Sequence, residues 1–213
     1  MLKRIAISNF KSLKQVPEAP SIGLELNPVN VFIGPNGSGK SSFLQAIDFL
    51  KAFFASSVEV YLKEKDWDWK DLPNLRETHK TIRWSLQAEL VPGSDGRGGG
   101  TYDYSVCLSP RRYLGVGEEV LFYRPVGREL PEILLQRKGR SVSLRNRARS
   151  VVDKFRALDL PASIMSRLRA WRDRERYPEL LHFREWVERF RSFLLWDPKL
   201  LRQRDRGKHD MLG

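Results

Sequence analysis

Hydrophobic and polar positions follow two different periods along this chain. Strict alternation runs through residues 82–90 and 101–108, on either side of the glycine-rich stretch 92–100, and predicts a β-hairpin. Shorter apolar runs at residues 2–7 and 120–123 predict two further strands. The first part of the chain is therefore expected to contain an antiparallel β structure.

The pattern after residue 130 predicts a second hairpin and then helices. Apolar runs at 133–136 and 142–144 flank a basic tip at 137–140. After Ser150 the period becomes helical, with one stripe through Ile164, Leu168 and Trp171. A longer helical stripe contains Leu180, Phe183, Val187, Phe190 and Leu194, and Pro178 suits the first turn of that helix.

Residues 29–55 show a pattern that differs from the alternating strands described above. The short apolar run 29–33 has the character of a strand buried in a central sheet. It leads into a glycine-rich loop, after which Phe43, Ile47, Leu50 and Phe54 recur at helical spacing. The succession predicts a strand, a loop and a helix over 41–55.

The loop matches the phosphate-loop pattern G-x-x-x-x-G-K-[ST]. The residues expected to bind the nucleotide are Gly34, Asn36, Gly37, Ser38, Gly39, Lys40, Ser41 and Ser42. Glycines allow positive φ angles and a close approach of the backbone to phosphate, and the helix that follows directs its N–H groups at the anion. A preceding strand and a following helix are the context that the motif needs.

Individual roles follow from the chemistry of the motif. Lys40 is expected to reach the β- and γ-phosphates and is the candidate catalytic residue, while the hydroxyl of Ser41 is expected to ligate Mg²⁺. Ser42 would lie near the α-phosphate. The sequence therefore predicts ATP and Mg²⁺ as cofactors.

The loop and the opening segment 5–13 (IAISNFKSL) together resemble the phosphate-loop ATPases of the RecF and SMC group. More closely, they resemble the N-terminal half of ABC-type, or RecF-like AAA-type, ATPases, a family that includes overcoming-lysogenisation-defect (OLD) nucleases and phage-defence ATPases. The resemblance implies an α/β fold: a P-loop NTPase lobe with an antiparallel β subdomain and a helical arm. It is specific over residues 1–50 and only architectural beyond residue 80.

Three further site residues come from the resemblance alone. It implies that the basic residue and the serine of the N-F-[KR]-S turn, here Lys11 and Ser12, lie beside the nucleotide. A solvated turn lysine is the alternative for Lys11. The family also has a glutamine that touches magnesium and the attacking water; Gln87, Gln136 and Gln203 are candidates, of which Gln136 is placed best and an ordinary exposed glutamine is the alternative.

Several parts that the family uses for hydrolysis are missing from the sequence. It has no signature motif, no apolar run ending in Asp-Glu (Walker B) and no strand-borne switch histidine. We therefore expect residues 1–150 to form a P-loop ATP-binding lobe and residues 151–213 an arginine-rich helical arm that continues into a C-terminal ATPase half. Little ATPase activity is expected from this chain alone, because loop and metal lack a group that orients water.

Charge divides the chain unequally. Residues 1–110 carry 13 basic and 12 acidic side chains, whereas residues 111–213 carry 25 basic ones, 21 of them arginine, against 14 acidic. Such a field favours a polyanionic partner, most simply nucleic acid, and a solvated basic helical face is the alternative. Glu118 and Glu119 are interpreted as part of a solvated acidic turn rather than a metal centre.

Composition narrows the cellular setting. The sequence has 41% hydrophobic residues, no apolar run of membrane-spanning length, no signal peptide and one cysteine, Cys107, expected on a strand. These features predict a cytoplasmic protein without a membrane partner.

The sequence is compatible with three functions. The first is the ATP-binding half of an ATPase for DNA repair, recombination or phage defence, in which ATP engages two protomers of a homodimer or a C-terminal partner half. The second is a non-hydrolysing ATP-binding adaptor or remnant whose partner chain supplies catalysis. The third is a transporter ATPase subunit, which the N-F-K-S turn and the basic arm argue against.

Overall fold

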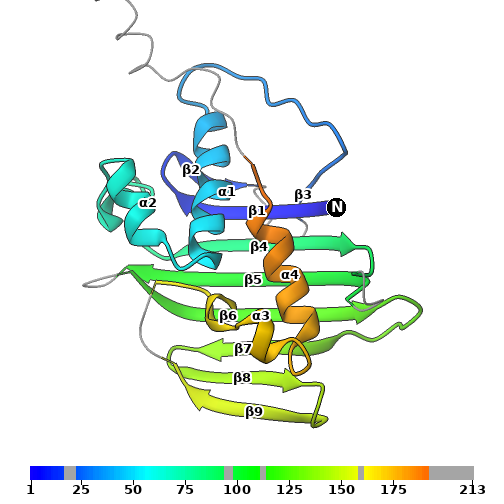
Figure 1. Cartoon of the computed structure of the whole chain (residues 1–213). Helices are drawn as coiled ribbons and strands as arrows, with labels where there is room; N and C mark the ends of the chain where they lie inside the picture. Colours follow the sequence, from blue (N-terminus) through cyan, green and yellow to red (C-terminus); the bar gives the residue numbers. More distant parts are fainter. Residues whose placement is uncertain (17–22, 94–97, 111–113, 158–160, 192–213) are drawn as a thin grey trace, which may run out of the picture.

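The computed structural model describes residues 1–16, 23–93, 98–110, 114–157 and 161–191. Within these residues a single antiparallel sheet organises the molecule, with the strand order β2-β1-β4-β5-β6-β7-β8-β9 and β3 paired to β1 (Figure 1). The strands are β1 (Leu2–Phe10), β2 (Leu13–Val16), β3 (Leu24–Glu25), β4 (Ile82–Leu90), β5 (Gly100–Pro110), β6 (Leu114–Pro125), β7 (Glu132–Lys138), β8 (Ser141–Asn146) and β9 (Val151–Arg156).

The alternating sequence of β4 determines which face of the sheet is covered. Residues at even positions from Ile82 to Leu90 are buried, and the odd positions between them are exposed or half-buried. β4 pairs with β5 in the register Trp84↔Val106, so the apolar sides of both strands share one face. Both predicted hairpins, 82–108 and 133–144, are thereby confirmed.

The helices lie against that apolar face (Figure 1). They are α1 (Lys40–Phe54), α2 (Val58–Glu64), the short 3₁₀ helices η1 (Trp69–Asp71) and η2 (Ile164–Arg167), α3 (Ala170–Asp173) and α4 (Pro178–Glu188). The helix expected over 41–55 is confirmed as α1, and α4 begins with Pro178 as predicted. No helix among the described residues combines the length and apolarity needed to cross a membrane.

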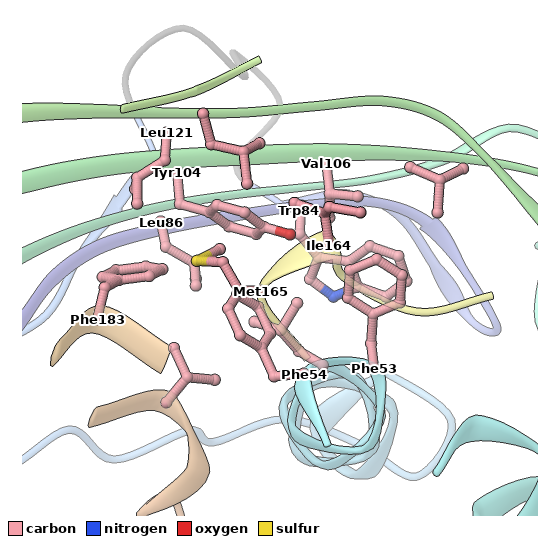
Figure 2. Packing of buried hydrophobic residues seen from close by; sticks show 14 of the residues in the cluster. Phe53, Phe54, Trp84, Leu86, Tyr104, Val106, Leu121, Ile164, Met165 and Phe183 are labelled. Carbon is pink, nitrogen blue, oxygen red and sulfur yellow. The ribbon is translucent and has the colours of Figure 1, made fainter. Parts of the chain in front are cut away.

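Aromatic side chains join the helices to the sheet. Phe49 of α1 stacks on Trp84 of β4 with 5.4 Å between ring centroids, and Phe183 of α4 packs on Tyr102 and Phe54. Figure 2 shows Phe53 and Phe54 directed from α1 toward Trp84, Tyr104 and the 3₁₀ segment with Met165. Each fully buried aromatic side chain of this size contributes about 1.5–3 kcal/mol, so this core fixes α1 and, with it, the loop that precedes the helix.

The predicted strand at 29–33 is wrong. This segment is not part of the sheet, and Val29, Val31 and Ile33 are 80%, 76% and 91% exposed. In Figure 1 it belongs to the blue connection that leaves the sheet after β3 and returns at the start of α1. A strand that is apolar on both faces is stable only between two hydrogen-bonded neighbours. Among the described residues, both edges of β1 are already paired, one with β2 and β3 and the other with β4. The segment 29–33 therefore cannot pair with β1.

The expected helical pattern after Ser150 is also corrected. Residues Val151–Arg156 form β9, which pairs with β8, and only then do helical turns begin. The stripe through Ile164, Leu168 and Trp171 divides between η2 and α3, and Trp171 is 85% exposed. Residues 161–191 pack onto the same core as the sheet, and the remainder of the expected arm, including Leu194 and Gln203, lies outside the described residues.

Glu119 does not belong to a solvated turn. It lies on the covered face of β6 and is completely buried, where its carboxylate accepts hydrogen bonds from Tyr104, Ser163 and the backbone N–H of Ile164. Burial raises the pKa of Glu119. The side chain therefore anchors η2 to the sheet. The sequence did not indicate this role, because Glu119 is adjacent to a second acidic residue, Glu118, and the pair suggested an exposed turn.

Candidate nucleotide site

The glycine-rich loop leads directly into the N-terminus of α1. Gly37 and Gly39 have φ angles of 81° and 96°, in the left-handed region that glycine adopts without strain. A Cβ atom on Gly39 would lie 2.7 Å from Leu13 Cδ2, and one on Gly34 would lie 2.8 Å from Ser38 Oγ. The backbone therefore favours glycine at positions 37 and 39, whereas a side chain at position 34 would require Ser38 to move.

The first turn of α1 has the properties of an anion site. Its N-cap residue, Gly39, provides no side chain to accept a hydrogen bond from the exposed N–H groups, and no acidic residue lies in the first turn. Unsatisfied N–H groups and the positive end of the helix macrodipole attract phosphate.

Lys40 folds back across the loop. Its Nζ donates hydrogen bonds to the carbonyl oxygens of Gly34 at 2.6 Å and Pro35 at 2.7 Å, and approaches Ser38 Oγ at 3.3 Å. The ammonium group is thus held over the loop, where a bound polyphosphate would lie. Asn36 forms part of the turn at the exposed tip of the loop.

The turn between β1 and β2 adjoins the loop. Ser12 Oγ lies 2.7 Å from Ser42 Oγ on the first turn of α1, so the structure brings these two predicted site residues together. The neighbouring Lys11 has a φ angle of 50°, and its N–H donates to the carbonyl oxygen of Leu72 at 2.6 Å. The turn is therefore attached both to the loop and to the segment before β4.

Lys11 is held against an aromatic ring. Its Nζ lies 2.9 Å from the ring centroid of Trp67, a cation–π contact. Burial lowers the pKa of Lys11 to about 8, and the nearby carboxylate of Asp71 opposes that shift. Lys11 is thus not simply a solvated turn lysine.

A cavity of about 570 Å³ opens between the loop and the segment 71–76. Its volume is within the usual range for small-molecule sites. The residues around it are Lys11, Ser12, Gly37, Ser41, Ser42 and Gln45 on one side and Asp71, Pro73, Asn74, Leu75 and Arg76 on the other. The loop and the start of α1 therefore form one wall of the cavity, and the segment 71–76 forms the second wall.

The second wall was not predicted from the sequence. Asn9 of β1 holds it in place: its side-chain amide donates to the carbonyl oxygens of His79 and Thr81, and its Oδ1 accepts from Asn74 N at 2.9 Å. The sequence signal for this wall is the asparagine of the N-F-K-S turn, because asparagine side chains often hydrogen-bond to backbone groups. The structure shows Asn9 buried and at a positive φ angle.

The residues present suit magnesium only in part. Ser41 lines the cavity and is exposed, as a hydroxyl ligand of Mg²⁺ would be. Mg²⁺ is usually held by few protein groups together with substrate phosphates, so a serine hydroxyl beside a phosphate-binding loop fits it. No group of three or more His, Cys, Asp or Glu side chains with metal-binding geometry occurs among the described residues.

Gln136 lies away from this region. It is exposed on β7, opposite Val120, while its neighbours Leu135 and Arg137 are buried on the helix-covered face. Three strands, β4, β5 and β6, separate β7 from β1 in the sheet. The structure does not bring Gln136 to the loop, and its contact with magnesium stays a prediction.

Fold and loop together define a class of protein. Residues 1–95 match the family model of the AAA ATPase domain. The N-terminal region of this chain is that of a RecF- and OLD-like AAA ATPase with a phosphate loop.

Two particular relatives can be named. Over 50 residues, 24% of this chain, it is 42% identical to the OLD nuclease of Thermus scotoductus. Over 60 residues, 26% of the chain, it is 45% identical to the DNA replication and repair protein RecF of Colwellia psychrerythraea. The chain spans only 8% and 14% of the lengths of these two relatives.

Proposed function

We propose that this chain is the ATP-binding part of an ATPase that acts on nucleic acid. The observation that carries the proposal is that three features meet at the loop: glycines with the required φ angles, an uncapped helix N-terminus and the ammonium group of Lys40. The cavity beside them is lined by Gly37, Ser41 and Ser42. Each of these features favours phosphate, and together they favour a polyphosphate.

Each group of residues would contact a different part of the nucleotide. Backbone N–H groups from Gly37 to Ser42 would hold the phosphates, and Lys40 would exchange its loop carbonyl partners for the β- and γ-phosphate oxygens. Ser41 would hold Mg²⁺, which supplies charge neutralisation to the phosphates when bound. Lys11 and Ser12, on the turn beside Ser42, would contact the nucleotide from the other side of the loop.

We propose that binding is accompanied by little turnover in this chain alone. Phosphoryl transfer to water needs a group that orients the attacking water. Asp71 is the only carboxylate among the described residues that line the cavity, and its Oδ2 already accepts a hydrogen bond from the N–H of Asp68 at 2.7 Å. A second chain that supplies a water-orienting group would complete the site. The same arrangement would apply if this chain is an ATP-binding adaptor whose partner carries out hydrolysis.

The nucleic-acid part of the proposal has separate support. The two relatives are named as a nuclease and as a DNA replication and repair protein. Residues 111–213 hold most of the net charge of +12 carried by the chain. A positive surface of this kind attracts the phosphate backbone.

Titration calorimetry with Mg-ATP tests the nucleotide part. The wild-type chain is expected to bind saturably with a stoichiometry near one, whereas Lys40→Ala should weaken binding at least tenfold, the loss expected for a charge-assisted contact of about 1.5–3 kcal/mol. Continuing heat from hydrolysis would contradict the proposal of little turnover. Equal binding by both proteins would contradict the site itself.

A further inference from the structure

Among the described residues, one face of the sheet carries no helices, and this face is strongly basic at one end. The helices cover the opposite face in the described part of the chain (Figure 1). On β7, β8 and β9 four basic side chains, Lys138, Arg145, Lys154 and Arg156, alternate with residues of the covered face. We call these four residues the basic patch; all are exposed except Arg145, which is half-buried.

Strand register places the four side chains on a common surface. Lys138 pairs with Ser141, which pairs in turn with Arg156, and this forms one row across three strands. Lys154 lies opposite Ser143 in the next row, and Arg145 lies on β8 in the row after that. Side chains that share a row, or alternate along a strand, point to the same side of a sheet.

The acidic residues of these strands point the other way. Asp153 receives hydrogen bonds from Asn146 and from the hydroxyl of Tyr177, which puts it on the covered face. Glu132 is paired there with Arg147. On the open face, Glu118 of β6 lies opposite Lys138. Of the five basic side chains on these three strands, four therefore lie on the open face, and only the buried Arg137 lies on the covered one.

The spacing of the basic patch fits a phosphate backbone. Adjacent strands lie about 4.8 Å apart and alternate residues on a strand about 6.7 Å apart, so the four charges lie within an area of roughly 10 by 14 Å. Successive phosphates of one DNA strand rise about 3.4 Å along the helix axis, so a patch of this length spans several phosphates. The intervening Ser141 and Ser143 are short enough to let a backbone approach and can donate hydrogen bonds to it.

We propose that the open face of β7–β9 is the surface on which this protein holds duplex nucleic acid, through phosphate contacts from the basic patch. This inference rests on the proposed function and locates its partner. Contacts are to phosphates rather than base edges, because the patch consists of lysine and arginine side chains spread over the face of three strands. Binding is therefore independent of sequence and steeply dependent on salt.

The salt dependence gives the expected magnitude. Four phosphate contacts predict a slope of log affinity against log salt of about −3.6, which is a loss of roughly 150-fold between 50 and 200 mM salt. The double variant Lys154→Gln/Arg156→Gln removes two contacts. Its slope should fall to about −1.8, a loss of only roughly 12-fold over the same range.

The test measures binding of a fluorescein-labelled 30-base-pair duplex by anisotropy across a salt series. The matched control is Lys51→Gln/Lys63→Gln, which removes the same charge from α1 and α2 on the helix-covered side. The control should keep the wild-type slope. Equal slopes for the patch variant and the wild type, or no binding of duplex by the wild type at 50 mM salt, would overturn the proposal.

Two further arms separate this inference from the nucleotide site. The patch variant should bind Mg-ATP with unchanged affinity, and Lys40→Ala should bind duplex as the wild type does when nucleotide is absent. If the wild type binds duplex through the patch but does not bind Mg-ATP, only the proposed nucleotide site is contradicted. Patch-dependent binding to vesicles of anionic lipid without binding to duplex would overturn the assignment to nucleic acid.

Discussion

Two lysines of the candidate site differ in how their surroundings hold them. Lys40 donates to two loop carbonyls, whereas Lys11 is partly buried against the ring of Trp67. The phosphate-loop motif identified Lys40 in the sequence because its spacing is local. Lys11 was placed beside the loop only by resemblance, and its contact with Trp67 joins residues 56 positions apart, which no local pattern reveals.

The lowered pKa of Lys11 predicts a pH dependence of nucleotide affinity. Because the free protein has a pKa of about 8 at Lys11, the side chain loses its charge above that pH, while bound polyphosphate raises the pKa again. Affinity for Mg-ATP should therefore decrease about tenfold between pH 8 and pH 9.5. Lys11→Arg, which stays charged, should show no such decrease, and identical pH profiles would contradict the role of Lys11.

At the level of elements, the sequence predicted the antiparallel part of the fold correctly. Alternation in β4 and β5 and the helical stripe of α1 are strong local signals, and all three elements formed where expected. The run 29–33 failed because a buried strand is defined by its neighbours as well as its own residues. The wall at 71–76 was missed for a related reason: it is positioned by Asn9, far away in the sequence.

The exposed position of 29–33 predicts that substitutions there cost little stability. Ile33→Thr should change the free energy of unfolding by less than about 0.5 kcal/mol, because Ile33 is 91% exposed. Ile5→Thr, at a position in β1 that is 1% exposed, should lower it by roughly 2 kcal/mol or more. Urea denaturation measures both variants. Similar losses for both would show that 29–33 is buried in solution.

At the level of the whole molecule, the sheet separates two tasks. Its covered face holds α1 through the aromatic core, and α1 presents the loop to the cavity. Its open face carries the basic patch on β7–β9, several strands away from that cavity. The sequence indicated a basic second half, but only strand register showed that four of its basic side chains lie together on one face.

We propose above all that the glycine loop and the segment 71–76 form the two walls of one nucleotide site. Hydrogen–deuterium exchange with and without Mg-ATP tests it most directly, with Lys40→Ala as the control. Nucleotide should slow exchange both at residues 37–43 and at residues 71–76, and the variant should lose both effects. Slower exchange at the loop alone, or at neither segment, would contradict it.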